Sequence, residues 1–162
     1  MIRPMTEADI PRAADIHVFA RRWAYRGSVS DQVLFGEMLV PQSVEKLAKV
    51  LADETAKNYV YDDGIIKGFM TFGPCHDEDK FDAQELWYIY IDPFMQRQGI
   101  GSKLITLFEE EVRQNCKIVC LRTLERNDTA RVFYEKNGYA PDGMKHFVSD
   151  GWGYQMRYTK IL

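Results

Sequence analysis

Apolar residues recur at helical spacing in four stretches of this chain of 162 residues, and 101–114 is the clearest of them. There Leu104, Phe108 and Val112 share one face, as in a helix that packs on a core. Three further helices are expected, over 6–25, 43–51 and 127–138. Ser43 is the expected N-cap of the second of these, and irregular chain is expected before it. Asn127 or Asp128 is the expected N-cap of the third.

Shorter runs rich in β-branched and aromatic residues predict the strands. The runs 58–61 and 65–72 flank Asp62-Asp63-Gly64, which is typical of a tight hairpin turn. Strands are also expected at 2–5, 83–91 and 118–121, and a last hairpin around 150–151. The strand–helix–strand order from 83 to 121 predicts that its two strands are parallel or splayed neighbours in one sheet. The chain is therefore expected to form one domain over 1–162, of mixed α/β or α+β class.

Composition and charge limit what such a domain is expected to bind. The formal net charge is −3, whereas nucleic acid and anionic membranes require a basic face, so neither partner is expected. No apolar run approaches the ~20 residues that span a bilayer, and no signal region follows the first residues, so a cytoplasmic location is expected. Cys75, Cys116 and Cys120 contain no Cys-x-x-Cys pair, which favours reduced thiols over a metal site.

The segment Gln96-Arg97-Gln98-Gly99-Ile100-Gly101 lies between a predicted strand and a predicted helix. Its glycines allow a sharp turn that exposes N–H groups at the helix start, where the helix dipole favours an anion. Arg97 can bind a phosphate with two hydrogen bonds. A P-loop would need a lysine and a Ser or Thr directly after its second glycine, but Ser102-Lys103 follow here. The segment is therefore either a phosphate site or a strand–helix turn whose glycines serve only the backbone geometry.

This segment has the pattern Gln/Arg-x-x-Gly-x-Gly/Ala, which resembles the coenzyme A pyrophosphate loop of the GNAT (Gcn5-related) N-acetyltransferases. The run 127–139 also matches the family pattern Asn-x-x-Ala-x-x-x-Tyr-Glu-x-x-Gly-Tyr. The strand 85–93 and the opening run 2–10 are similar to family segments as well. The resemblance covers nearly the whole chain and is strongest from Glu85 to Tyr139. It implies a twisted, mostly antiparallel sheet with central splayed parallel strands, flanked by helices.

The resemblance also implies acetyl-CoA as the cofactor and transfer of its acetyl group to a primary amine of a small molecule or peptide. The amine would attack directly in a ternary complex. Tyr134 would donate a proton to the leaving thiolate, because a phenol and a thiol have similar pKa values. The implied cofactor-binding residues are Ile89, Ile91, Gln96, Arg97, Gln98, Gly99, Ile100, Gly101, Ser102, Asn127, Ala130 and Tyr134.

The group that removes the proton from the amine is less sharply defined. Glu85 opens its strand and is the first candidate, with an exposed strand-end carboxylate as the alternative interpretation. His76 is the second candidate, and some family members use no dedicated base. His17 and His146 have no neighbours in sequence that indicate catalysis.

The acceptor side of the site is expected to be aromatic. The predicted acceptor-binding residues are Trp23, Tyr25, Arg26, Trp87 and Trp152, joined by Tyr154; packing in the core is the alternative for each. The run 77–85 holds five acids and one lysine, and it is either a solvated loop or a lip that attracts an amine cation.

Two other functions use the same fold and loop. One is an acyl-CoA-binding or regulatory module without turnover, and the other is a transferase with a different acyl donor. A homodimer through the terminal strand is a further expectation.

Overall fold

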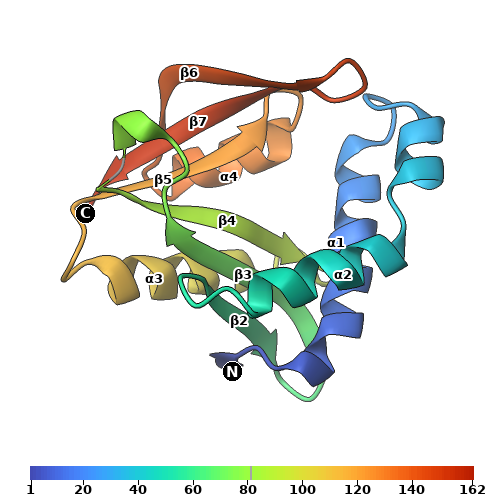
Figure 1. The fold of residues 1–162 in the computed structure, drawn as a ribbon, viewed down its shortest axis with the longest axis horizontal. Coiled ribbons are helices and arrows are strands. Elements are labelled where there is room, and N and C mark those ends of the chain that lie inside the picture. Colours follow the sequence, from blue (N-terminus) through green and yellow to red (C-terminus); the bar gives the residue numbers. More distant parts are fainter. Residues whose placement is uncertain (81) are drawn as a thin grey trace.

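The structure is a computed structural model that describes residues 1–80 and 82–162. Its centre is a seven-stranded sheet in the order β1-β2-β3-β4-β5-β7-β6 (Figure 1). The strands are β1 (Ile2–Pro4), β2 (Lys57–Asp62), β3 (Ile66–Pro74), β4 (Gln84–Ile91), β5 (Ile118–Leu124), β6 (Ala140–Ser149) and β7 (Gly153–Ile161). The helices are α1 (Ile10–Tyr25), α2 (Val40–Leu51), α3 (Ile100–Val112) and α4 (Asp128–Lys136). Short 3₁₀ turns lie at Glu7–Asp9, Glu78–Lys80 and Pro93–Met95, and a π-helical segment lies at Gln32–Glu37.

The centre of the sheet is the parallel pair β4–β5, and the other strand pairings are antiparallel. These two strands pair only where Gln84–Leu86 faces Val119–Leu121, although β4 runs on to Ile91 and β5 to Leu124. Beyond that point the strands diverge, as Figure 1 shows. The predicted mixed sheet with splayed parallel strands is therefore confirmed.

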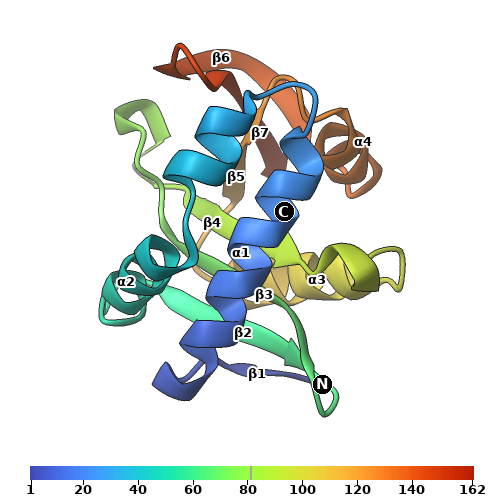
Figure 2. The same ribbon diagram turned by 90° about the vertical axis from the view of Figure 1, so that its right-hand side faces the viewer.

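Each face of the sheet is covered by its own helices and has its own core. On one face, Leu104 and Phe108 of α3 pack with Phe72 and Leu86 of the sheet. On the other face, α1 and α2 cover Phe69 and the half-buried tyrosines of β4, and Figure 2 shows α1 in front of the strands with α2 beside it. The residues of β4 thus alternate between two different environments, as the two-residue period of a strand requires.

The second helix begins earlier than the sequence predicts. α2 starts at Val40, and Pro41 lies in its first turn, where the missing N–H of proline costs no helical hydrogen bond. The side chain of Gln42 accepts the N–H of Leu39 at 3.4 Å. The prediction that Ser43 is the N-cap is wrong, because Pro41 already belongs to the first turn of the helix. Ser43 is buried within the helix instead.

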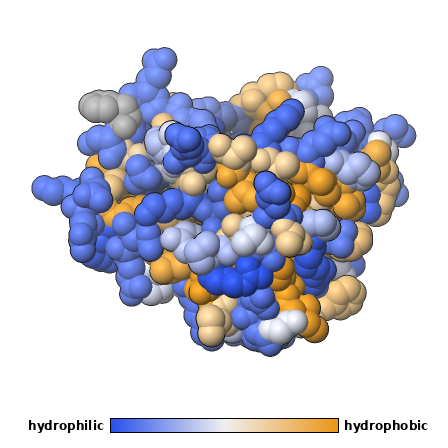
Figure 3. All heavy atoms as spheres, turned by 60° about the horizontal axis from the view of Figure 1, so that its bottom comes forward, coloured by the Kyte–Doolittle hydropathy of each residue, from blue (hydrophilic) through white to orange (hydrophobic). Residues whose placement is uncertain are grey.

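The surface combines polar and apolar side chains without a clear division. On the face drawn in Figure 3, hydrophobic groups are interrupted by hydrophilic ones. Among the described helices, none joins the length and the apolar character that crossing a bilayer requires.

Candidate active site

The loop from Gln96 to Gly101 connects β4 to α3 through two left-handed residues. Arg97 has φ of 62° and Gly99 has φ of 75°. Such turns arrange successive N–H groups around a concave space that suits an anion. The first N–H groups of α3 have no acceptor within the helix and point the same way. A Cβ built on Gly99 would meet no atom within 4 Å, so the approach to these N–H groups is open.

Gly101 has a different role from Gly99. A Cβ at Gly101 would lie 3.0 Å from the ring of Phe133 in α4, which is closer than side chains tolerate. Its missing side chain therefore lets the start of α3 pack directly against α4. This contact holds the loop beside the helix that carries the second predicted motif.

The second motif begins with the cap of α4. The Oδ1 atom of Asn127 accepts the N–H of Ala130 at 3.1 Å, so Asn127 is the N-cap of the two predicted alternatives, and Asp128 is the first residue of the helix. The Nδ2 atom of Asn127 donates to the hydroxyl of Tyr25 at 3.4 Å. The cap thus ties α4 to the end of α1, on the far side of the strand gap.

Tyr134 lies on α4, in the same core cluster as Leu86 and Leu121, the last paired residues of β4 and β5. It is 7% exposed, and its hydroxyl makes no hydrogen bond with any residue that the structure describes. Burial raises the pKa of Tyr134, and the nearby phenols of Tyr90 and Tyr25 raise it further. The hydroxyl therefore stays protonated and available as a donor.

Glu85 is buried rather than exposed at the strand end. It is 4% exposed, and its Oε2 atom accepts the backbone N–H of His76 at 3.0 Å and contacts His76 Nδ1 at 2.8 Å. Arg122 approaches its other oxygen at 3.5 Å. The imidazole of His76 is 58% exposed. The two candidate bases therefore form one unit, which leads from the buried carboxylate to solvent.

Two thiols lie beside this carboxylate. The Sγ atoms of Cys75 and Cys120 are 3.1 Å apart, and both lie within 4.8 Å of an oxygen of Glu85. Burial raises the pKa of Cys120, so its thiol stays protonated. All three cysteines carry free thiols, including the buried Cys116. A protonated thiol is a poor metal ligand, because metal ions bind the thiolate.

The acidic run 77–85, of which residue 81 lies outside the described part of the chain, is held by arginines. Asp77 pairs with Arg122 at 2.7 Å and with Arg157 at 2.9 Å. Asp79 binds Arg157 through both oxygens, at 2.6 and 2.7 Å. These ion pairs favour a structural role for the run over a lip that attracts a cation.

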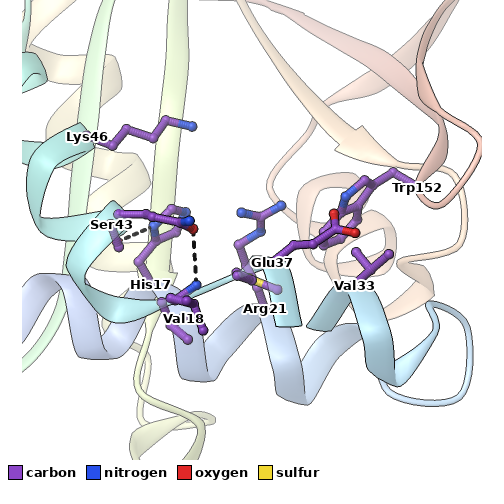
Figure 4. A pocket seen from close by; sticks show the side chains of 11 residues that line it. His17, Val18, Arg21, Val33, Glu37, Ser43, Lys46 and Trp152 are labelled. Carbon is purple, nitrogen blue, oxygen red and sulfur yellow. Dashed lines mark hydrogen bonds between the residues drawn. The ribbon is translucent and has the colours of Figure 1, made fainter. Parts of the chain in front are cut away.

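A cavity of about 240 Å³ lies between α1, the π-helical segment, α2 and the β6–β7 turn (Figure 4). Trp152, which the sequence analysis names as a candidate acceptor-binding residue, lines it. Tyr25 lies behind Trp152, with its ring edge-on at 5.4 Å between centroids, and it is buried in the core. One of the predicted aromatic residues, Trp152, therefore lines the cavity, and a second, Tyr25, packs against Trp152.

The other predicted acceptor residues lie elsewhere. Trp23 is 47% exposed on the outer side of α1, and the guanidinium of Arg26 lies over its ring at 4.1 Å. Neither residue lines the cavity. Trp87 packs on the imidazole of His76 at 4.8 Å between ring centroids, next to Glu85. Tyr154 is exposed and contacts Phe147.

The structure also places His17 in the lining of the cavity, although no sequence pattern indicated a role for this residue. Its Nδ1 atom lies 2.7 Å from the hydroxyl of Ser43, and its ring packs on Tyr90 of β4 at 4.7 Å. Burial, and then the charges of Arg21 and Lys46, lower the pKa of His17 to about 3. His17 is therefore a neutral residue that joins the cavity to the central strand.

A family model described as acetyltransferase (GNAT) domain matches residues 54–141, which is more than half of the chain. The match includes β4, the loop from Gln96 to Gly101 and α4. A search of curated proteins finds no match.

Solved structures share the fold over the whole chain. A PaiA N-acetyltransferase from Thermoplasma acidophilum, in complex with coenzyme A, superposes with a TM-score of 0.80 at 18% identity, covering 100% of this chain and 98% of that one. A ribosomal-protein-alanine N-acetyltransferase from Brucella melitensis gives 0.74 at 21% identity, covering 100% and 99%. YncA from Salmonella typhimurium with its cofactor acetyl-CoA gives 0.72 at 16% identity, covering 100% and 93%.

Proposed function

Since the chain belongs to the GNAT acetyltransferase family, we propose that it transfers the acetyl group of acetyl-CoA to a primary amine of a small molecule or peptide. The observation that carries the proposal is the phenol of Tyr134, which lies in one cluster with Leu86 and Leu121, the last paired residues of β4 and β5. A phenol whose hydroxyl makes no hydrogen bond with a described residue is available as a donor to a reaction that develops negative charge beside it.

The residues present fit acetyl-CoA. The open N–H groups around Gly99 suit its pyrophosphate, with Gln96 and Arg97 beside them. Past Leu86, β4 has no hydrogen-bonded partner on its β5 side, so backbone groups near Ile89 and Ile91 are available to the pantetheine amides. When bound, acetyl-CoA supplies a thioester, whose carbonyl carbon is the electrophile.

The protein's own residues account for the proton transfers. The Tyr134 hydroxyl donates a hydrogen bond, and then its proton, at the place where a thiolate would leave. Glu85 accepts the proton of the attacking amine, directly or through His76, which reaches solvent. Attack by the amine in a ternary complex needs no further nucleophile from the chain.

The test is the variant Tyr134→Phe, which removes the hydroxyl and keeps the ring. Thiol released from acetyl-CoA is measured across a panel of amines, and coenzyme A binding is measured by calorimetry. We expect kcat to fall by roughly 10²- to 10⁴-fold, the usual contribution of general acid catalysis, with little change in coenzyme A affinity.

Tyr139→Phe is the matched control, because Tyr139 is also buried and its hydroxyl lacks a partner among the described residues. It packs near Tyr134, at 6.3 Å between ring centroids, yet its hydroxyl is not assigned to the reaction. Equal kcat values for wild type and Tyr134→Phe would remove the acid role. Coenzyme A binding without turnover of any amine would favour a binding module, and turnover only with longer acyl donors would favour a different transferase. A homodimer and a cytoplasmic location stay predictions from the sequence.

A further inference from the structure

Two cations face the cavity beside β4 without an acidic partner. Figure 4 shows the guanidinium of Arg21 between the Lys46 ammonium group and the indole of Trp152. Over the residues 1–80 and 82–162, Arg21 forms no ion pair or hydrogen bond, and its contact is with the Trp152 ring at 4.5 Å. Lys46 likewise lies over the ring of Tyr88, at 5.1 Å. Both cations line the cavity and are therefore available to an anionic ligand that enters it.

The other groups that line the cavity do not cancel this charge. Glu37 is the acid among the lining residues, and it makes no ion pair with Arg21 or Lys46 within the part of the chain described here. His17 also lines the cavity and is neutral, because burial and the charges of the two cations lower its pKa. Its hydrogen bond with Ser43 further occupies its Nδ1 atom. Two cations and one acid leave the cavity with an excess of positive charge.

The cavity lies next to the helix that carries the proposed acid. Tyr25 packs on Trp152 of the cavity, and the hydroxyl of Tyr25 accepts from Asn127 Nδ2 at the start of α4, the helix of Tyr134. At about 240 Å³ the cavity is smaller than the roughly 300–1,000 Å³ of sites for drug-sized ligands, so it suits a molecule of amino-acid size.

We propose that the acceptor is a small amino carboxylate, such as a free amino acid, whose carboxylate binds between Arg21 and Lys46. This rests on the proposed acetyltransferase function. A guanidinium binds a carboxylate with two parallel hydrogen bonds, which orients the ligand as well as holding it. An acceptor with positive charges alone, such as a polyamine, would meet repulsion from these two cations.

The test compares each amino acid with its amide, which keeps the skeleton and removes the negative charge. The probes are alanine, lysine, phenylalanine and γ-aminobutyrate with their amides, and kcat/KM is measured with acetyl-CoA. Because the amide changes the intrinsic reactivity of the amine, the quantity of interest is the acid-to-amide ratio in wild type against the same ratio in variants.

We expect at least one pair for which wild type prefers the acid by roughly 10- to 100-fold, in keeping with charge-assisted hydrogen bonds. Arg21→Gln should lower that ratio by a similar factor, and Lys46→Gln by a smaller one because its ammonium is more exposed. Lys49→Gln is the matched control: it removes the same charge from the exposed side of the same helix and should leave the ratio unchanged.

Turnover of amides as good as that of acids, or equal ratios in wild type and Arg21→Gln, would overturn this inference and leave the acetyltransferase proposal standing. If no amine is acetylated, the proposed function fails, and calorimetry of the same amino acids in the presence of coenzyme A decides the inference. Binding by wild type that Arg21→Gln abolishes supports the carboxylate site. Binding that is absent, or equal in both proteins, contradicts it.

Discussion

Arg157 and Arg21 lie on the same molecule in opposite electrostatic situations. Arg157 is 2% exposed, and its guanidinium binds Asp77, Asp79 and Asp142 at distances of 2.6–2.9 Å. Arg21 is half-buried, and the structure gives it an aromatic ring and no acid. The charge of Arg157 is therefore paired with acids of the chain, whereas the charge of Arg21 has no acidic partner among the described residues.

This difference separates charges that hold the fold from charges that are available to a ligand. The acids around Arg157 tie the connection after β3 to β6 and β7, and they stabilise the region that covers Glu85. Arg21 and Lys46 contribute little to the stability of the fold and can contact a ligand that enters the cavity. Three measurements test this distinction between structural charges and charges available to a ligand.

The largest effect is expected from Arg157→Met, which removes a buried guanidinium from Asp77, Asp79 and Asp142. Of these three acids, Asp77 keeps its pair with Arg122. Removing one member of a buried ion-pair network costs about 3–5 kcal/mol, and we expect a loss of that size in the free energy of unfolding, measured by urea denaturation. Lys57→Met is the control, because Lys57 forms a surface pair with Glu111, and such pairs contribute about 0–1 kcal/mol. Equal losses for the two variants would show that the Arg157 network is not structural.

A smaller effect is expected from acid, through His17. The pKa of His17 is about 3 in the folded chain, whereas a histidine in an unfolded chain has a pKa of about 6.5. Between these values the unfolded state binds more protons, so the free energy of unfolding falls as the pH falls. The loss at pH 5 relative to pH 7 is about 2 kcal/mol.

His17→Gln tests this, since glutamine keeps a polar group near Ser43 and does not titrate. Urea denaturation at pH 7 and pH 5 should show a smaller decrease for the variant than for wild type. Parallel decreases would mean that His17 is not responsible.

The smallest effect is expected from Arg21→Gln on stability. The variant loses a cation–π contact with Trp152, which contributes about 0.5–1 kcal/mol at sites of this kind, and no ion pair. Urea denaturation should therefore show a change well below that of Arg157→Met. A loss as large as that of Arg157→Met would make Arg21 a structural residue and weaken its assignment to the cavity.

Local signals predicted most of the fold. The order of elements around 83–121 predicted that β4 and β5 are parallel neighbours, because only a few connections of that length are allowed. The cap at Asn127 was also predicted, since it depends on residues within one helical turn. The predicted N-cap at Ser43 was wrong, because a proline can follow the end of one segment or lie in the first turn of a helix. Only the surrounding structure decides between these two positions.

The amino-acid sequence alone determined the backbone of the loop 96–101 and the motif that carries Tyr134, because glycines and helix caps act over a few neighbouring residues. The tertiary structure decided which charges are paired. Asp77 and Arg157 are far apart along the chain and neutralise each other, while Arg21 on α1 meets no acid among the residues that the structure describes. The same long-range packing buried Glu85 against His76 and turned Trp23 away from the cavity. Electrostatic pairing depends on distances in space, and those distances exist only once the sheet and its helices have assembled.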